Sequence, residues 1–316
     1  MNQCYCWSHR TLTMKCLISL YLLTSILHLS SSANWCYQTQ VSCDGHCKGP
    51  ELWKEENQEC GKNRQSPINI VTKKTKLDER LTPLKFNGYE TKFDSIIKNN
   101  GHSVQVNIPN TPTVSGGNLG ETYKAIQFHL HWGRDGGPGS EHTIDGEQYP
   151  MELHIVHMKQ RYNKIDDALK DPSGIAVLGF FYEESNSANK GYDQLIDALK
   201  KIQNKNGNMT LRKISLNQLI LSEERMTNYY RYNGSLTTPG CNEVVVWTVF
   251  ENPIPLSKEQ LQAFSSLYFH DGKRMVQTFR PVQSRNGRVV YRSSGQVFVA
   301  SALLLFTSIT TAFSLI

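Results

Sequence analysis

Three histidines on two short apolar segments have the types and spacing needed to hold one metal ion. His129 and His131 stand two residues apart in the segment 125–131, and His154 lies in the segment 152–157. Side chains two residues apart on a β-strand point to the same face. If the two segments are neighbouring strands, the three imidazoles converge. Three neutral nitrogen ligands with an open fourth position are typical of a catalytic zinc site.

Each of these segments also carries a polar partner two residues before its histidine. Gln127 precedes His129, and Glu152 precedes His154. At metal sites such groups accept the N–H of the second ring nitrogen and fix the orientation of the ligand. The sequence therefore predicts Zn²⁺ as the cofactor, with Gln127 and Glu152 as supporting residues. A zinc peptidase is disfavoured because the chain contains no His-Glu-x-x-His motif.

The elements that must position these residues read mainly as strands. Short apolar or alternating segments, punctuated by Gly, Pro and Asn, recur along the chain at 103–108, 125–131, 152–157, 175–181 and 244–250. Helical patterns are confined mainly to 192–202 and to the residues after a Ser-Lys-Glu-Gln capping box at 257–260. No internal repeat or Pro/Ser-rich linker divides the chain. We expect a mostly β fold: a single domain on a large, twisted, mainly antiparallel sheet with short peripheral helices.

Both ends of the chain differ in composition from this domain. Residues 14–33 combine Met-Lys, an apolar run and a small-residue segment ending at Ala33, which is typical of a secretory signal peptide. We therefore expect residues 1–33 to be removed, with the translation start at either Met1 or Met14. Residues 297–316 are apolar, carry no charge and follow the small residues Ser293, Ser294 and Gly295.

The C-terminal pattern predicts a glycosylphosphatidylinositol (GPI) anchor signal, 294–316, removed on attachment of the lipid to Ser293 or, alternatively, Ser294. The apolar run is also long enough to span a bilayer, so a single-pass anchor is the alternative. Both place the domain 34–293 at the extracellular face of the plasma membrane. Of its charges, 32 are basic once Arg10 and Lys15 are removed, against 28 acidic, and this mild excess gives no indication of a nucleic-acid partner.

Five cysteines remain after removal of the signal peptide, namely Cys36, Cys43, Cys47, Cys60 and Cys241. In an exported protein these are expected to pair, and the odd number leaves one over. A cysteine zinc site is the competing interpretation, but the three histidines are the better ligand set. Two glycosylation sequons occur. We expect modification at Asn208, in a polar loop. We expect none at Asn233, which adjoins the loop 236–237, because a glycan there would collide with the active-site cavity.

Eight segments together resemble the α-carbonic anhydrase family, in order and across essentially the whole domain. The chain resembles in particular the GPI-anchored extracellular branch of this family, types IV and XV. The features that carry this closer resemblance are the N-terminal Trp-Cys-Tyr at 35–37, the position of Cys60 just before the segment 65–70, and the C-terminal tail. The segments are 65–70 (Gln-Ser-Pro-Ile-Asn-Ile), 99–102 (Asn-Asn-Gly-His), 127–132 (Gln-Phe-His-Leu-His-Trp), 139–142 (Gly-Ser-Glu-His), 152–157 (Glu-Leu-His-Ile-Val-His), 176–179 (Ala-Val-Leu-Gly), 234–239 (Gly-Ser-Leu-Thr-Thr-Pro) and 246–248 (Val-Trp-Thr).

The resemblance implies reversible hydration of carbon dioxide to bicarbonate and a proton through a zinc-bound hydroxide. By it, His129, His131 and His154 match the zinc ligands, and Thr237 with Glu141 matches the pair that orients the hydroxide. His102 matches the proton shuttle at the cavity mouth. Thr238 lines the pocket, and the residues that match the apolar wall for carbon dioxide are Val156, Val177, Leu236, Val245 and Trp247.

The family pattern has further implications. Cys60 is expected to pair with Cys241, and Cys36 with Cys47 or, less favourably, Cys43. Association with bicarbonate transporters is implied by the resemblance alone. A catalytically silent, partner-binding relative is the alternative of a different class. Such relatives typically lack a zinc ligand, whereas this chain keeps all three histidines.

Overall fold

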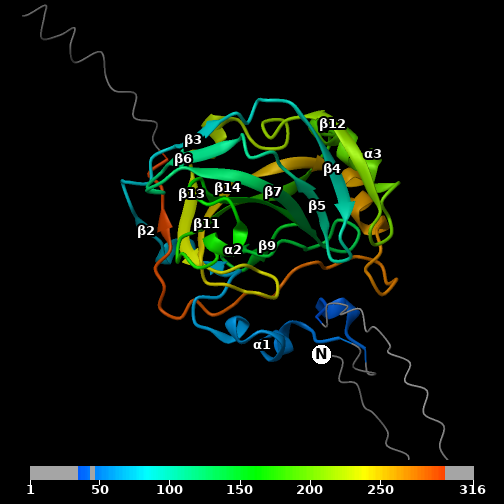
Figure 1. The fold of residues 1–316 in the computed structure, drawn as a ribbon, viewed down its shortest axis with the longest axis horizontal. Coiled ribbons are helices and arrows are strands. Elements are labelled where there is room, and N and C mark those ends of the chain that lie inside the picture. The colour runs from blue at the N-terminus through cyan, green and yellow to red at the C-terminus, as the bar shows by residue number, and fades with distance from the viewer. Residues whose placement is uncertain (1–34, 43–46, 296–316) are drawn as a thin grey trace, which may run out of the picture.

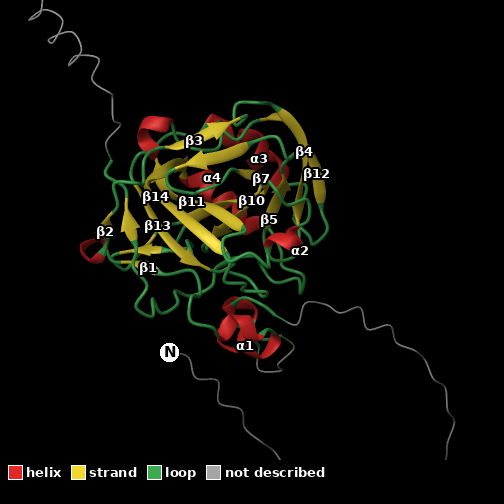
Figure 2. Ribbon diagram, turned by 60° about the vertical axis from the view of Figure 1, so that its left-hand side comes forward, coloured by secondary structure: helices red, strands yellow, loops and turns green. Residues whose placement is uncertain are grey.

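The computed structural model describes residues 35–42 and 47–295. The expected signal peptide and nearly all of the expected anchor signal lie outside the described residues, as does Cys43. Within the described ranges, no helix is long and apolar enough to cross a membrane. Helices are short and lie around a large central sheet (Figure 2). They are α1 (Trp53–Glu56), α2 (Ile165–Ala168), α3 (Asp193–Leu199) and α4 (Lys258–Ala263), with interspersed 3₁₀ turns.

The central sheet has twelve strands in the described part of the chain, most of them antiparallel, as expected (Figure 1). Its main path runs β12-β4-β5-β7-β10-β11-β14-β13-β15-β2, and β3 and β6 pair beside β7. The pairs β11–β14 and β15–β2 are parallel, so the sheet is mixed. The strands are β2 (Lys76–Leu77), β3 (Leu84–Asn87), β4 (Phe93–Asn99), β5 (Val104–Asn107), β6 (Thr113–Gly116), β7 (Tyr123–Trp132), β10 (Met151–Lys159), β11 (Ile175–Ser185), β12 (Asn208–Ile214), β13 (Tyr229–Gly234), β14 (Val245–Ser257) and β15 (Tyr291–Arg292).

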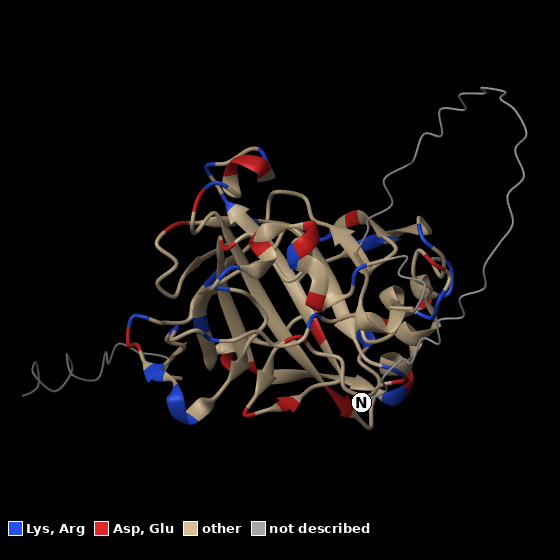
Figure 3. Cartoon of the chain, turned by 90° about the horizontal axis from the view of Figure 1, so that it is seen from below, with Lys and Arg blue, Asp and Glu red and all other residues tan. Residues whose placement is uncertain are grey.

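A small second sheet lies beside the large one. It pairs β1 (Asn69–Ile70) with β8 (Thr143–Ile144), and β8 with β9 (Glu147–Gln148). The expected capping box is present, because Ser257 accepts the N–H of Gln260 at the start of α4. The Ser66–Pro67 peptide bond is cis. Basic and acidic segments alternate around the molecule in Figure 3, consistent with the mild net charge.

The sheet is buried on both faces at its centre. Every residue of β10 is buried, which explains why this strand reads as a continuous apolar run instead of an alternating one. Residues of β10 pack alternately into two hydrophobic clusters on opposite faces of the sheet. Leu153 and Ile155 belong to the larger cluster, and Val156 and Met158 belong to the smaller one. The smaller cluster also contains Val177, Val245 and Trp247, so the expected carbon dioxide wall lies on one face.

Candidate metal centre and active site

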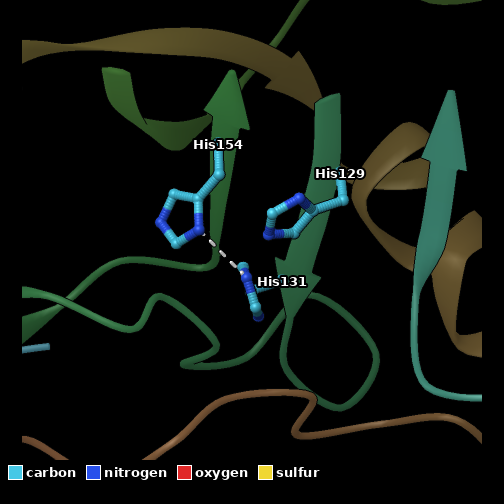
Figure 4. A group of neighbouring side chains, drawn as sticks. All are labelled: His129, His131 and His154. Carbon is cyan, nitrogen blue, oxygen red and sulfur yellow. Dashed lines mark hydrogen bonds between the residues drawn. The ribbon is translucent and has the colours of Figure 1, made fainter. Parts of the chain in front are cut away.

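The three predicted ligands come together at the centre of the sheet. Strands β7 and β10 are antiparallel neighbours, and their register places His154 opposite His129. The ring centroids of the three histidines are 4.6 to 5.2 Å apart. Figure 4 shows the rings pointing toward one another from the two strands. The alternation inferred from the sequence thus produces the predicted convergence.

The second nitrogen of each ring has a hydrogen-bond acceptor. His129 Nδ1 lies 2.9 Å from Gln127 Oε1, and His154 Nε2 lies 2.7 Å from Glu152 Oε1. These are the two supporting contacts expected from the sequence. His131 Nδ1 lies 2.6 Å from the Thr278 carbonyl oxygen, which can only accept. Each imidazole therefore donates from that nitrogen and keeps a lone pair on the other.

The donor set fits zinc. His131 Nε2 and His154 Nδ1 face each other at 3.1 Å (Figure 4), and both carry lone pairs when their partner nitrogens donate. Two acceptors cannot hydrogen-bond to each other, so a cation is needed between them. Tetrahedral zinc with Zn–N distances of about 2.0–2.1 Å separates two ligand nitrogens by about 3.3 Å. Burial lowers the pKa of His131 to about 3, and it also lowers that of His129 and His154, which favours the neutral, ligating form.

Glu152 holds two histidines at once. Its Oε1 also accepts from His142 Nδ1 at 2.7 Å, and its Oε2 accepts the backbone N–H groups of Glu141 and His142. His142 Nε2 lies 2.6 Å from the Tyr232 hydroxyl. Burial alone would raise the pKa of Glu152. The two histidines, His142 and His154, nevertheless hold this pKa well below its ordinary value. Because protons already join these groups, His142, Glu152 and His154 form an orienting network and not a second metal site.

Glu141 lies beside the three histidines, and one of its two carboxylate oxygens accepts a hydrogen bond. Its Oε1 accepts the backbone N–H of Arg280 at 2.8 Å. Its Oε2 is buried, lies 3.4 Å from His131 Nε2, and has no hydrogen-bond partner among the described residues. Burial raises the pKa of Glu141, while the Arg280 N–H and the nearby Thr237 hydroxyl oppose that rise. Thr237 thus lies close to the Glu141 carboxylate, although no hydrogen bond between the two side chains meets the usual geometry.

A cavity of about 400 Å³ opens over the histidines. His129, His154, Thr237 and Thr238 line it together with four of the five expected wall residues, which are Val156, Val177, Leu236 and Trp247. Val245, the fifth, does not line the cavity but lies behind it, 1 % exposed in the same apolar cluster. Ile126 and Ile165 also line the cavity. Sequence reasoning missed them, and no local signal distinguishes them from other surface or core isoleucines.

His102 lies away from the lining of this cavity. Its ring stacks on Trp35 at 3.9 Å between centroids and lies 4.9 Å from that of His270. His102 Nδ1 is buried without a hydrogen-bond partner among the described residues. Burial, followed by the charges of His270 and Lys205, lowers the pKa of His102 to about 4. The contact with His270 could not be inferred from the sequence, because the two residues are far apart in the chain and share no motif.

The described residues contain two disulfides, Cys60–Cys241 and Cys36–Cys47. The first is the expected pair, and the second joins Cys36 to its favoured partner. Cys241 closes the loop that carries Thr237 and Thr238. Its N–H donates to the Thr238 carbonyl at 2.9 Å, and Gln65 donates to the Cys241 carbonyl. The disulfide therefore fixes the loop that forms one wall of the active-site cavity.

The two sequons lie differently from what was expected. Asn208 is exposed but opens strand β12 at the sheet edge, instead of standing in a loop. Asn233 is exposed on β13, opposite Val246, whereas its neighbour Tyr232 faces His142. Because adjacent strand residues point to opposite faces, Asn233 points away from the histidine cavity. The reason for expecting Asn233 to be unmodified, a collision with that cavity, is therefore wrong.

Comparison with known proteins agrees with this geometry. The eukaryotic-type carbonic anhydrase family matches residues 48–294. Carbonic anhydrase 4 of Rattus norvegicus is 41 % identical over 89 % of this chain and 91 % of its own length. Carbonic anhydrase 15 of Mus musculus is 35 % identical over 88 % of this chain and 88 % of its own length. Carbonic anhydrase 12 of Homo sapiens is 37 % identical over 84 % of this chain and 77 % of its own length. The chain therefore belongs to the eukaryotic-type carbonic anhydrase family and is a carbonic anhydrase.

Proposed function

We propose that this carbonic anhydrase is a zinc enzyme that hydrates carbon dioxide at the outer cell surface, with His129, His131 and His154 as the metal ligands. The observation that carries the proposal is the pair of lone-pair nitrogens, His131 Nε2 and His154 Nδ1, facing each other at 3.1 Å. When bound to three histidines, zinc lowers the pKa of a bound water to about 7, the value known for carbonic anhydrase, and so supplies a nucleophile at neutral pH.

Glu141 and Thr237 orient that nucleophile. The Arg280 N–H already occupies Oε1 of Glu141, so Oε2 is the oxygen left to accept the Thr237 hydroxyl proton. A hydroxyl that donates in this direction presents only lone pairs to the cavity. Thr237 therefore accepts a hydrogen bond from the nucleophile. This hydrogen bond directs a lone pair of the nucleophile at the carbon atom of the substrate.

The apolar side of the cavity suits an uncharged substrate. Val156, Val177, Leu236 and Trp247 offer carbon dioxide no hydrogen bonds, and bicarbonate, once formed, gains more from water than from this wall. Val245 supports the wall from behind. Thr238 is the polar lining residue next to Thr237, at the boundary between the apolar wall and the histidines.

His102 carries the proton outward. The return of a hydrated proton to the nucleophile is limited by diffusion to about 10¹⁰ M⁻¹ s⁻¹. With a water pKa of about 7, direct release of the proton to bulk water is therefore limited to about 10³ s⁻¹. Carbonic anhydrases can reach about 10⁶ s⁻¹, which requires an intermediate carrier. In the described arrangement His102 is stacked on Trp35. We infer that it rotates toward the cavity to accept the proton and returns toward Trp35 to release it.

Metal analysis together with stopped-flow hydration kinetics tests this function. Protein secreted by expressing cells should contain one zinc per chain, lose activity when a chelator removes the zinc, and regain it on zinc addition. Folded, disulfide-bonded protein that lacks both zinc and activity would instead support the silent, partner-binding alternative. Association with a bicarbonate transporter can be tested separately by co-purification from such cells.

We further propose that a GPI anchor attached at Ser293 or Ser294 holds the enzyme on the membrane. Ser293 is 6 % exposed, and its hydroxyl and N–H bond to Thr227 and Tyr229. Among the described residues no hydrogen bond holds Ser294, so accessibility favours cleavage after Ser294. Phosphatidylinositol-specific phospholipase should release active enzyme from cells, and mass spectrometry of the released C-terminus should identify the residue. Release by detergent alone would favour the single-pass anchor.

A further inference from the structure

A second, larger cavity of about 540 Å³ lies on the opposite face of strands β13 and β14 from the histidine site. It opens at the end of the sheet where β13, β15 and β2 run side by side, at the left of Figure 1. Four arginines line it, against one carboxylate, that of Asp78. The arginines are Arg64, Arg80, Arg231 and Arg288.

Arg231 is the unusual member of this set. Its side chain enters from β13 and is only 7 % exposed. Nε donates to Thr248 Oγ1 at 3.1 Å and Nη1 donates to the Gly117 carbonyl at 2.7 Å, but Nη2 is buried without a partner. Among the described residues no carboxylate lies within 4.0 Å of this guanidinium. A buried charge without a counter-charge is destabilising relative to one that is paired.

Within the described residues, the other charged groups of the cavity form no ion pair with Arg231. Arg80 forms a bidentate pair with Asp78, and Arg64 pairs with Glu243, so both are already neutralised. Among the described residues, Arg288 donates only to carbonyl oxygens, which are those of Gln65, Asn233, Ser284 and Arg285. Within the described part of the chain, Arg231 and Arg288 thus leave the cavity with two uncompensated positive charges.

We propose that this cavity binds an organic oxyanion, a phosphate or carboxylate on an apolar body, whose oxygen accepts the free N–H groups of Arg231. The planar guanidinium donates in a geometry that matches both head groups. The cavity is larger than an inorganic ion requires, and Leu81, Leu119 and Val246 supply apolar wall for the rest of the ligand. The site is separated from the zinc centre by the sheet, so its occupation need not block hydration.

Calorimetric titration with phenyl phosphate, at constant ionic strength, tests the proposal. Asn233 lines the same cavity, so N-glycans are trimmed first. Anions can also bind at a zinc centre, so zinc-loaded and zinc-depleted protein are compared, and the hydration rate is recorded. We expect binding in both forms, tighter than that of inorganic phosphate. Loss of binding on zinc removal would place the anion at the metal and overturn the proposal.

Arg231→Gln should weaken binding about tenfold or more, as loss of a charged hydrogen-bond donor predicts. The matched control is Arg212→Gln, an exposed arginine that contacts Asp94 on β4. It should bind as the parent protein does. Equal affinities of the Arg231→Gln and Arg212→Gln variants would refute the assignment.

A second pair of variants keeps the test decisive if Arg231→Gln does not fold. Arg80 is 71 % exposed, so Arg80→Gln should fold, and it leaves Asp78 unpaired at the cavity. Asp78→Asn removes that carboxylate instead. We expect affinity to fall about two- to fivefold in Arg80→Gln and to rise by a similar factor in Asp78→Asn. Changes of equal sign, or no change in either variant, would contradict anion binding in this cavity.

Discussion

The metal-centre histidines and the pair His102–His270 use the same side chain in opposite ways. At the metal centre each ring has one nitrogen committed to a fixed acceptor, Gln127, Thr278 or Glu152, and the other directed at a common point. At the pair, both Nδ1 atoms are buried without partners among the described residues, and His102 is held mainly by stacking on Trp35. A hydrogen bond from one nitrogen to a fixed acceptor holds each converging ring in one orientation. Stacking alone leaves a ring free to rotate, and proton transfer requires such rotation.

The largest effect is expected from a change at one of the three converging histidines. His129→Ala removes one of three ligands, and two remaining imidazoles cannot retain zinc, so metal content and hydration should be lost together. The readouts are metal analysis and stopped-flow kinetics on the same preparation. His157→Phe serves as a control, because His157 is buried on the same strand as His154 but bonds to Tyr89 and Ile155. Full zinc content in His129→Ala would show that the three rings do not act as a set.

Thr237→Ala separates orientation from metal binding. The variant should keep its zinc, because Thr237 is not a ligand, and should lose about 100-fold in kcat/KM, a typical cost of removing one oriented group at a reacting centre. Glu141→Gln should behave similarly, since an amide cannot accept at both of its terminal atoms as a carboxylate does. Loss of zinc from either variant would mean that these residues support the metal itself.

At the stacked histidine, His102→Ala should lower kcat in dilute, bulky buffer and leave kcat/KM nearly unchanged. Proton release follows bicarbonate departure, so it cannot alter substrate capture. The residual kcat should approach the limit of about 10³ s⁻¹ set by bulk water, and added imidazole should restore it. An unchanged kcat in dilute buffer would identify another group as the carrier.

The smallest effect concerns the titration of His102. Its pKa of about 4 lies below the unfolded value of about 6.5, so the stacked arrangement is fully stable above pH 6.5 and loses stability as pH falls toward 4. The charged or titratable groups that affect it are His270, Lys205 and Asp271. His270→Asn removes one repelling charge, so the His102 pKa should rise by a fraction of a unit, measured by NMR. An unchanged pKa would mean that the charge of His270 does not act on the ring and that burial controls it.

Local sequence pattern predicted the part of the site that lies within strands. The two-residue spacing of Gln127, His129 and His131 and of Glu152 and His154 fixes which side chains share a face, so convergence required only that the strands be neighbours. The large sheet, its dominant antiparallel pairing and the α4 capping box follow from similarly local signals.

The contacts that could not be predicted join residues far apart in the chain. His131 donates to a backbone carbonyl, that of Thr278, and any residue type could supply such an acceptor. Arg280 likewise contacts Glu141 through its backbone N–H. The stacking of His102 on Trp35 depends on how an N-terminal segment returns to the sheet. None of these contacts has a periodicity or a residue-type signature.

The contact between His131 and Thr278 has a consequence for the order of events during synthesis. The two residues are 147 positions apart. At translation rates of about 5–20 residues per second, the ribosome delivers the acceptor on the order of 10 to 30 s after the ligand. His154 is added 23 residues after His131. From then until Thr278 arrives, the nascent chain carries three histidines whose rings are not all oriented, so its affinity for zinc is below that of the finished domain. Tight metal uptake therefore belongs to the end of translation, when the segment with Thr278 and Arg280 has packed against the sheet.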